Sequence, residues 1–150
     1  MKEDYLYSKI LELFDDKYHV FLKYPIQDGS MREIDVLCVQ KQNDDPEMLA
    51  IEAKVSNWKV AFRQAFSRLF YIDRSYIALP FQYATSVNYT TLKKNGVGLI
   101  LVDGSAKVII DAKKTDKTLQ WRREMLLKDI MRKLRENEPH DLLSGASNRW

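Results

Sequence analysis

The sequence predicts an α/β domain with a mixed β-sheet flanked by helices. Short apolar segments with strand-like composition recur along the 150-residue chain. The strongest helical pattern, residues 56–72, lies between two such segments, as a crossover between parallel strands requires. Short polar loops join other neighbouring strands, and such loops are typical of antiparallel hairpins. The sheet should therefore contain both kinds of strand pair.

The first third of the chain predicts one helix followed by three strands. Leu6, Ile10 and Phe14 recur at helical spacing within residues 4–15. An aromatic and β-branched segment then predicts a strand, which the turn QDGS closes. The polar segment KQNDDPE predicts a hairpin loop between two buried strands. In order, the three expected strands are YHVFLKYPI (18–26), EIDVLCVQ (33–40) and MLAIEAKV (48–55).

The crossover helix leads into the second half of the sheet. Trp58, Phe62 and Ala65 belong to its apolar face, which has helical spacing, and Ser56 or Asn57 can cap its N-terminus. A strand, a loop with a further helix to about residue 95, and two strands joined at a glycine follow. A last amphipathic helix is expected at residues 117–135. The later strands are SYIALP (75–80), GVGLILVD (96–103) and KVIIDAK (107–113).

Length and composition fit one domain with a single core. Hydrophobic residues make up 45% of the chain and charged residues 30%, and the net charge of +3 is compatible with a polyanionic partner without requiring one. We expect residues 1–112 to form the core and residues 113–136 a basic helix, packed on the core or at an oligomer interface. Residues 137–150 lose their periodicity, so we expect a mobile tail there.

Several classes of protein have little support in this sequence. The lone cysteine, Cys38, lies in an apolar run and cannot form a disulfide within the chain, which favours a reducing cytoplasm. The N-terminal segment lacks the apolar core of a signal peptide, and no apolar run reaches membrane-spanning length. His19 and His140 are far apart and have no nearby His or Cys, which argues against zinc sites and nucleophilic triads.

The strand MLAIEAKV carries Glu52 and Lys54 on one face, because side chains two residues apart on a strand point the same way. Asp35 lies near the start of the preceding strand, and the hairpin should place it beside Glu52. Two neighbouring carboxylates repel each other unless a cation lies between them. Their oxygen atoms suit Mg²⁺, or Mn²⁺ in its place, with other positions left to water and substrate. Such a metal polarises a phosphodiester and lowers the pKa of a bound water, which Lys54 could orient.

A solvated Glu52–Lys54 pair on an exposed sheet face is the alternative, since the E-x-K tripeptide is common by chance. Three features favour a site. The neighbouring strands are apolar on both faces. Gln64 and Arg68 fall on one polar stripe of the next helix, although a solvated stripe explains them equally well. Glu3 lies within the apolar sector of the first helix, although the positive end of the helix dipole also favours a carboxylate there.

Taken in order, these residues form the pattern E…(I)D…(I)E-A-K…Q on a helix, two strands and a helix. This pattern resembles the PD-(D/E)xK nuclease superfamily, which has the three-layer restriction-endonuclease-like fold. The stretch R-x-I-D…A-I-E-A-K-V-x-N-W-K…R-Q-A is similar to small uncharacterised prokaryotic members near the Holliday-junction-resolvase and VRR-type nucleases. The resemblance covers roughly residues 3–111, and its specific part is residues 32–80.

The resemblance implies a role for each residue of the pattern. Ile34 replaces the proline of the motif, a frequent replacement in the superfamily. Some relatives carry a tyrosine four residues after the glutamine, where this chain has Arg68, so the RecB-like subclass is disfavoured. Arg68 could instead contact a phosphate or be a surface arginine. The implied roles are metal ligands for Asp35 and Glu52, assistance of the attacking water for Lys54, support of the site for Gln64, and an outer or additional ligand for Glu3.

Basic residues outside the pattern are candidate nucleic-acid contacts. Arg32, three residues before Asp35, could contact a phosphate or close a turn. Between residues 113 and 135, nine Lys or Arg stand against three Asp or Glu, and Arg122 and Arg123 are among them. Their positive face could follow a nucleic-acid backbone, and the apolar face of the helix could pair with a second subunit to form a homodimer. A helix docked on its own domain with a solvated outer face is the alternative.

Together these features predict a Mg²⁺-dependent endonuclease that hydrolyses phosphodiester bonds in DNA, with RNA as the weaker option. A catalytically inactive nucleic-acid-binding or assembly module with the same fold is the alternative. A subunit of a larger defence or repair complex is a third interpretation, because the sequence shows no separate recognition domain.

Overall fold

The computed structural model describes residues 2–27 and 29–144, with side chains up to residue 136, and in this part the sheet has six strands in the order β1-β2-β3-β4-β5-β6. β1, β2 and β3 form antiparallel pairs, β3, β4 and β5 are parallel, and β6 is antiparallel to β5. The predicted mixed sheet is confirmed. The strands are β1 (Tyr18–Pro25), β2 (Glu33–Gln40), β3 (Met48–Ala53), β4 (Arg74–Pro80), β5 (Gly98–Asp103) and β6 (Ser105–Ile110). The helices are α1 (Glu3–Phe14), α2 (Trp58–Arg68), the 3-10 helix η1 (Phe81–Ser86), α3 (Tyr89–Lys94) and α4 (Gln120–Ser144).

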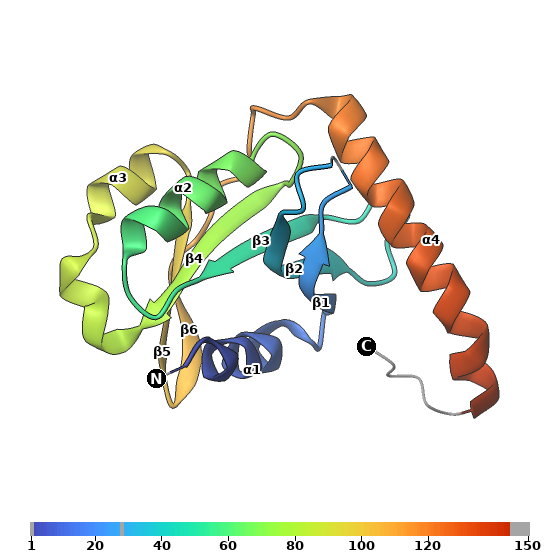
Figure 1. The fold of residues 1–150 in the computed structure, drawn as a ribbon, viewed down its shortest axis with the longest axis horizontal. Coiled ribbons are helices and arrows are strands. Elements are labelled where there is room, and N and C mark those ends of the chain that lie inside the picture. The colour runs from blue at the N-terminus through green and yellow to red at the C-terminus, as the bar shows by residue number, and fades with distance from the viewer. Residues whose placement is uncertain (1, 28, 145–150) are drawn as a thin grey trace.

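Helices cover both faces of the sheet, which gives a three-layer α/β arrangement. Figure 1 shows α1 below the sheet, α2 and α3 above it, and α4 beside β1 and β2. Alternate residues of β3 pack on opposite sides: Ile51 and Ala53 belong to the core under α1, whereas Met48 and Ala50 pack with residues of α4. Glu52 lies two residues after Ala50 and four after Met48 along the strand, so its side chain points to the same face, which α2 and α4 cover.

α2 approaches the sheet through two alanines. Ala61 and Ala65 are fully buried, whereas Phe62 and Phe66 are only partly buried at the edge of the interface. The apolar spacing predicted the helix and its packing face, but it did not separate central positions from flanking ones. Small side chains let the helix backbone come close to β3 and β4, and this brings Arg68 within reach of β3.

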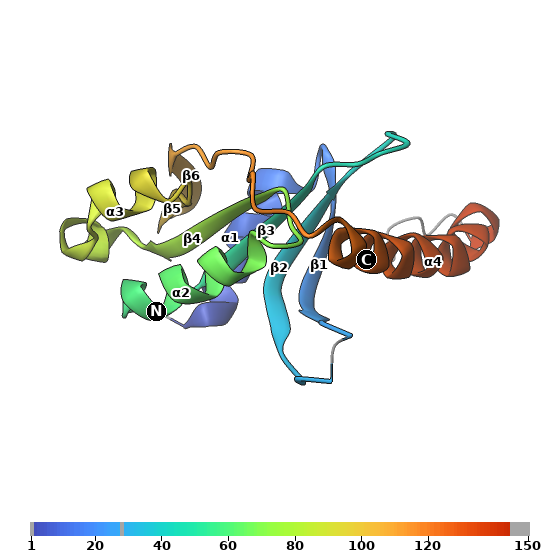
Figure 2. The same cartoon turned by 90° about the horizontal axis from the view of Figure 1, so that it is seen from above.

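α4 begins at Gln120, a little later than expected, and its backbone helix continues to Ser144, so it is longer than the predicted 117–135. The apolar spacing is lost after position 135, and Pro139 is unfavourable inside a helix, so no sequence signal predicts this continuation. Residues 145–150 of the expected tail lie outside the described part. Leu126 and Ile130 are buried in the core beside β1 and β2, so the helix docks on its own domain, and it extends past the sheet edge in Figure 2. None of the described helices is both long and apolar enough to cross a membrane.

Arg123 fixes the beginning of α4 to the body of the protein. Its Nε lies 3.0 Å from Asp73 Oδ1, its Nη2 donates to Asp73 Oδ2 at 3.1 Å, and its Nη1 donates to Asp45 Oδ1 at 3.2 Å. The side chain is only 11% exposed. This placement speaks against the expected phosphate contact for Arg123, because its charge is already neutralised within the fold.

Arg123→Met should lower the free energy of unfolding by about 2–3 kcal/mol, because it leaves the buried carboxylate of Asp73 without its charged partner. Urea denaturation followed by circular dichroism measures this change. Arg132→Met is the matched control: Arg132 also bonds two carboxylates of α4, Asp129 and Glu136, but it is solvent-exposed. We expect no resolvable change for the control. Equal effects of the two substitutions would contradict the anchoring role of Arg123.

Candidate functional site

Asp35 and Glu52 lie opposite each other on adjacent strands. The β2–β3 ladder pairs Leu37 with Ala50 and Val36 with Ile51, so the same register places Asp35 opposite Glu52 one step further on. Residues that face each other across an antiparallel pair project on the same side of the sheet. Asp35 Oδ2 also accepts a hydrogen bond of 2.9 Å from the backbone N–H of Ala53. The predicted proximity of the two carboxylates is therefore confirmed.

Glu52 is buried, and its charge partner is Arg68. The glutamate is 1% exposed and the arginine 4% exposed, and Arg68 Nε lies 3.5 Å from Glu52 Oε2. The other guanidinium nitrogens donate to the Tyr71 hydroxyl at 3.1 Å and to the Glu33 carbonyl at 3.0 Å. These contacts exclude a solvated Glu52 on an exposed face, and they also correct the expectation of a surface arginine at position 68. With its donors engaged inside the protein, Arg68 acts on Glu52 rather than on a phosphate.

Burial dominates the ionisation of both carboxyl groups. Desolvation raises the pKa of Glu52 to about 7; Arg68 lowers this pKa and Asp35 raises it. Desolvation also raises the pKa of Asp35, while the N–H of Ala53 and the charge of Lys54 lower it. A cation placed between these carboxyl groups would relieve both the burial penalty and their mutual repulsion. The pair is therefore suited to hold an additional positive charge.

Lys54 lies one residue beyond the end of β3, not within the strand as predicted. Its backbone N–H donates to the Ala78 carbonyl at 3.1 Å, which continues the pairing with β4. The side chain is partly buried, and its charge acts on Asp35. The charge of Lys54 therefore favours the ionised form of Asp35.

Glu3 and Tyr7 lie in the first two turns of α1, which covers the face of the sheet opposite Glu52, and the charge of Glu3 acts on Asp35. The Tyr7 hydroxyl lies 3.5 Å from Glu3 Oε1, and Tyr7 is only 6% exposed. Burial raises the pKa of Tyr7, and the charges of Asp35, Glu3 and Glu52 raise it further. Three carboxylates thus act on one hydroxyl. Tyr7 was not predicted as a site residue, although its position four residues after Glu3 places both side chains on one helix face.

Gln64 presents a buried polar atom toward the sheet. It precedes Arg68 by one helical turn and so lies on the same face of α2, the face that contacts Glu52. Among the side chains that the structure describes, Gln64 Oε1 is a buried oxygen without a hydrogen-bond partner. A buried carbonyl left unpaired costs about 1–3 kcal/mol, so a water or ligand hydrogen at this position would be stabilising. The predicted supporting role of Gln64 is compatible with this placement.

The donor set fits a magnesium ion held by two carboxylates. Within residues 2–27 and 29–136, no group of three or more His, Cys, Asp or Glu side chains is arranged to hold a metal. Mg²⁺ commonly takes one or two protein carboxylates and completes its shell with water and phosphate oxygens, which Asp35 and Glu52 can satisfy. Glu3 acts on Asp35 through its charge, and its role as an outer or additional ligand stays a prediction.

The structure also places two further predicted residues, Arg32 and Arg122. Arg32 is exposed in the turn before β2, where its carbonyl accepts a hydrogen bond of 2.9 Å from the N–H of Ile26. Arg122 is stacked on Tyr71, with its guanidinium carbon 4.4 Å from the ring centroid. Because Tyr71 also binds Arg68, Arg122 is connected to Glu52 through a short chain of side chains.

Comparisons with known proteins support the fold and leave the function open. No protein-family model matches the chain, and no curated protein matches it. A solved structure of a protein of unknown function from Silicibacter pomeroyi has a TM-score of 0.65 with this one. That similarity covers 100% of this chain and 97% of the other chain, at 16% identity. At this identity the similarity shows the three-layer α/β fold alone, and membership of the PD-(D/E)xK superfamily stays a prediction.

Protonation of Glu52 should make the protein more stable in mild acid. The pKa of this group rises from 4.5 to about 7 on folding, so the folded state binds more protons than the unfolded state between these values. The resulting stabilisation is complete below pH 4.5 and is lost as the pH rises through 7. Its size is about 3 kcal/mol.

Urea denaturation at pH 5 and pH 8, with EDTA present, measures this loss. Glu52→Gln removes the titrating group and keeps its shape. Between pH 5 and pH 8, the free energy of unfolding of the variant should therefore fall by about 3 kcal/mol less than that of the parent. Asp35 also has a raised pKa, and it is coupled to Glu52 by charge repulsion, so the difference between parent and variant reports the carboxyl pair rather than Glu52 alone. Parallel curves for parent and variant would show that Glu52 does not titrate in this range.

Proposed function

We propose that the protein is a metal-dependent nuclease that hydrolyses phosphodiester bonds in nucleic acid. The observation that carries the proposal is the placement of Asp35 opposite Glu52 on adjacent strands, with Lys54 immediately beyond the end of β3. The resemblance to PD-(D/E)xK nucleases favours DNA over RNA. A reducing cytoplasm is the proposed location, because Cys38 is buried and unpaired.

Each residue of the site has a distinct part in this reaction. Mg²⁺ or Mn²⁺, when bound, supplies a Lewis acid for the phosphodiester and lowers the pKa of water. Asp35 and Glu52 provide the oxygen atoms that hold the cation. Lys54, with its charge near Asp35, can orient the attacking water and neutralise negative charge that develops on the phosphate. The unpaired Gln64 Oε1 can accept a hydrogen bond from a water molecule.

The ion pair between Arg68 and Glu52 favours a second candidate, a nucleic-acid-binding module without catalytic activity. The buried arginine compensates Glu52 inside the protein, so the fold can keep this carboxylate without a divalent ion. In such a module the two carboxylates and Lys54 would be retained for stability or for binding alone.

Calorimetric titration with Mn²⁺ and a cleavage panel separate the two candidates. The nuclease should bind Mn²⁺ at one site, lose this binding in Asp35→Asn, and cut single-stranded, duplex and branched DNA or RNA substrates with Mg²⁺ but not with EDTA. The inactive module should leave every substrate intact under both conditions. Cleavage that continues in EDTA would also refute the metal-dependent proposal.

A further inference from the structure

A lysine-rich cavity lies where α3, the segment after β6 and the end of α2 meet. Its volume is about 260 Å³, and four of the residues that line it are Lys94, Lys113, Lys114 and Lys117. One carboxylate, Asp116, also lines it, and its Oδ1 lies 3.7 Å from Lys117 Nζ. All four lysines are exposed, so this cavity presents a net positive charge to solvent.

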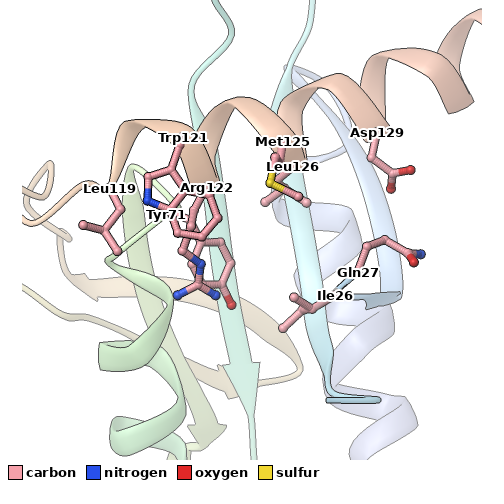
Figure 3. Close-up of a pocket in the computed structure, with 9 residues that line it drawn as sticks. All are labelled: Ile26, Gln27, Tyr71, Leu119, Trp121, Arg122, Met125, Leu126 and Asp129. Atoms are coloured by element: carbon pink, nitrogen blue, oxygen red, sulfur yellow. The ribbon is translucent and has the colours of Figure 1, made fainter. Parts of the chain in front are cut away.

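A second cavity, of about 500 Å³, lies under the beginning of α4. Figure 3 shows Trp121, Arg122 and Tyr71 gathered at one end of it, with Gln27 and Asp129 toward the other end. Trp121 is 62% exposed, although a large aromatic side chain is usually more buried in a folded domain. Arg122 covers the ring of the buried Tyr71, so the outer face of its guanidinium group is a second flat surface beside the indole ring.

The two cavities follow one another along the same two segments of chain. Lys117 lines the first cavity and Leu119 the second, and on the other side Leu69 lines the first and Tyr71 the second. The N–H of Leu119 donates to the Phe70 carbonyl at 2.8 Å, which holds the two segments together. Positive charge and aromatic surface are thus adjacent on one continuous strip, which residues 113–122 form.

This combination matches the chemistry of a single-stranded nucleic acid. Proteins that bind single strands pair cationic groups, which follow the phosphates, with aromatic and arginine surfaces on which bases stack. In a duplex, the faces of the bases are covered by their neighbours and cannot reach such a surface. A dimer interface between two copies of this chain fits this surface poorly. Charged residues are depleted at the centre of such interfaces, whereas four lysines lie beside the apolar cavity.

We propose that residues 113–122 and the end of α2 bind a single-stranded segment of nucleic acid. One base stacks against Trp121 and the outer face of Arg122, and the adjoining phosphates lie at the lysine-rich cavity. Tyr71 bonds Arg68, which pairs with Glu52, so the bound strand is connected to the site described above. The assignment of this strand as substrate rests on the proposed nuclease function, whereas the binding itself does not.

Fluorescence anisotropy of the full chain in EDTA tests the binding without cleavage. The probes are a fluorescein-labelled oligothymidylate of about 12 nucleotides and a hairpin duplex of equal charge. The parent should bind the single strand at least about 10-fold more tightly than the duplex. Trp121→Ala should weaken single-strand binding by about 10- to 100-fold, as expected for the loss of one stacked base.

The lysines are tested through salt dependence. Log affinity falls linearly with log salt, and we measure this slope from about 50 to 200 mM. In Lys113→Gln/Lys114→Gln the slope should be less steep than that of the parent by about 1.4. Lys128→Gln is the matched control: this lysine is exposed on α4 but lines neither cavity, so its slope should stay close to that of the parent.

Three outcomes would overturn the proposal: no binding of the single strand by the parent, equal affinity for the duplex, or unchanged affinity in Trp121→Ala. Light scattering on the same samples shows whether the third outcome goes with a dimer that Trp121→Ala dissociates. A parent that binds the strand in EDTA but cuts no substrate of the cleavage panel in Mg²⁺ would refute the nuclease and keep the binding proposal. Cleavage that is unaffected by Trp121→Ala would keep the nuclease and refute the assignment of the bound strand as its substrate.

Discussion

Glu52→Gln and Asp35→Asn should each lower the rate of nucleic-acid cleavage by at least about 100-fold. Each substitution replaces a negative oxygen ligand with a neutral amide of nearly the same shape. In Glu52→Gln, the new amide oxygen could still accept the hydrogen bond that Arg68 donates to the parent carboxylate. In Asp35→Asn, the amide oxygen could still accept from the N–H of Ala53. The fold should therefore survive while the affinity for Mg²⁺ and the rate both fall.

Glu33→Gln provides the matched control for these variants. Glu33 begins β2, two residues before Asp35, but its side chain is exposed and only its carbonyl contacts Arg68. Its variant should cut at the rate of the parent. Lys54→Met should retain binding of Mn²⁺ in calorimetry and still lose most of the rate, because its proposed part is to orient water. If Glu52→Gln, Asp35→Asn and Lys54→Met all cleaved like the parent, the assigned site would be wrong.

The sequence predicts the β2–β3 hairpin well because its signals are local. Two apolar segments flank a polar loop, and the two-residue period of a strand fixes which side chains share a face. From these signals alone, Asp35 and Glu52 are expected side by side, and the register of the structure confirms it. The crossover through α2 is equally clear, since its helical spacing is long and regular.

The partner of Glu52 could not be predicted from the sequence in the same way. A polar stripe on α2 suits solvent, a phosphate or a buried carboxylate equally well, and only tertiary packing decides among them. Ala61 and Ala65 bring the helix close to the sheet, and this turns Arg68 toward Glu52. The cap of the same helix was predictable: Asn57 Oδ1 accepts from the N–H of Val60 at 3.4 Å, as one of the two candidate caps should.

The count of basic residues in the last helix was also a poor guide to their roles. Arg122 and Arg123 are neighbours in sequence, but Arg122 stacks on Tyr71 whereas Arg123 bonds Asp73 and Asp45. Those partners come from distant parts of the chain, so charge along the helix could not reveal them. Lys113, Lys114 and Lys117 precede α4 rather than belong to it, and this puts positive charge beside the aromatic cavity.

Arg68→Met is expected to lower the free energy of unfolding by about 3–5 kcal/mol at pH 8, because it leaves the charge of Glu52 buried without compensation. At pH 5 the loss should be smaller, since Arg68 lowers the pKa of Glu52 and its removal lets the carboxyl group take up a proton more readily. Urea denaturation at both pH values measures the difference. Arg63→Met, an exposed arginine on the same helix, should leave stability unchanged.

A double variant assigns this loss to the ion pair rather than to the other contacts of Arg68. Arg68→Met combined with Glu52→Gln removes both charges, so it should be more stable at pH 8 than Arg68→Met alone, and the coupling energy gives the contribution of the pair. If the double variant were no more stable, the bonds of Arg68 to Tyr71 and to the Glu33 carbonyl would account for the loss instead.

The effect of Mg²⁺ on thermal stability tests whether the carboxylate that Arg68 stabilises also binds the metal. A cation that binds Asp35 and Glu52 compensates the charge that Arg68 otherwise balances, so Mg²⁺ should raise the melting temperature of Arg68→Met more than that of the parent. Asp35→Asn in the same background should cancel this gain. A nuclease site predicts that arginine and metal stabilise the same carboxylate, whereas an inactive module predicts no effect of Mg²⁺ on either protein.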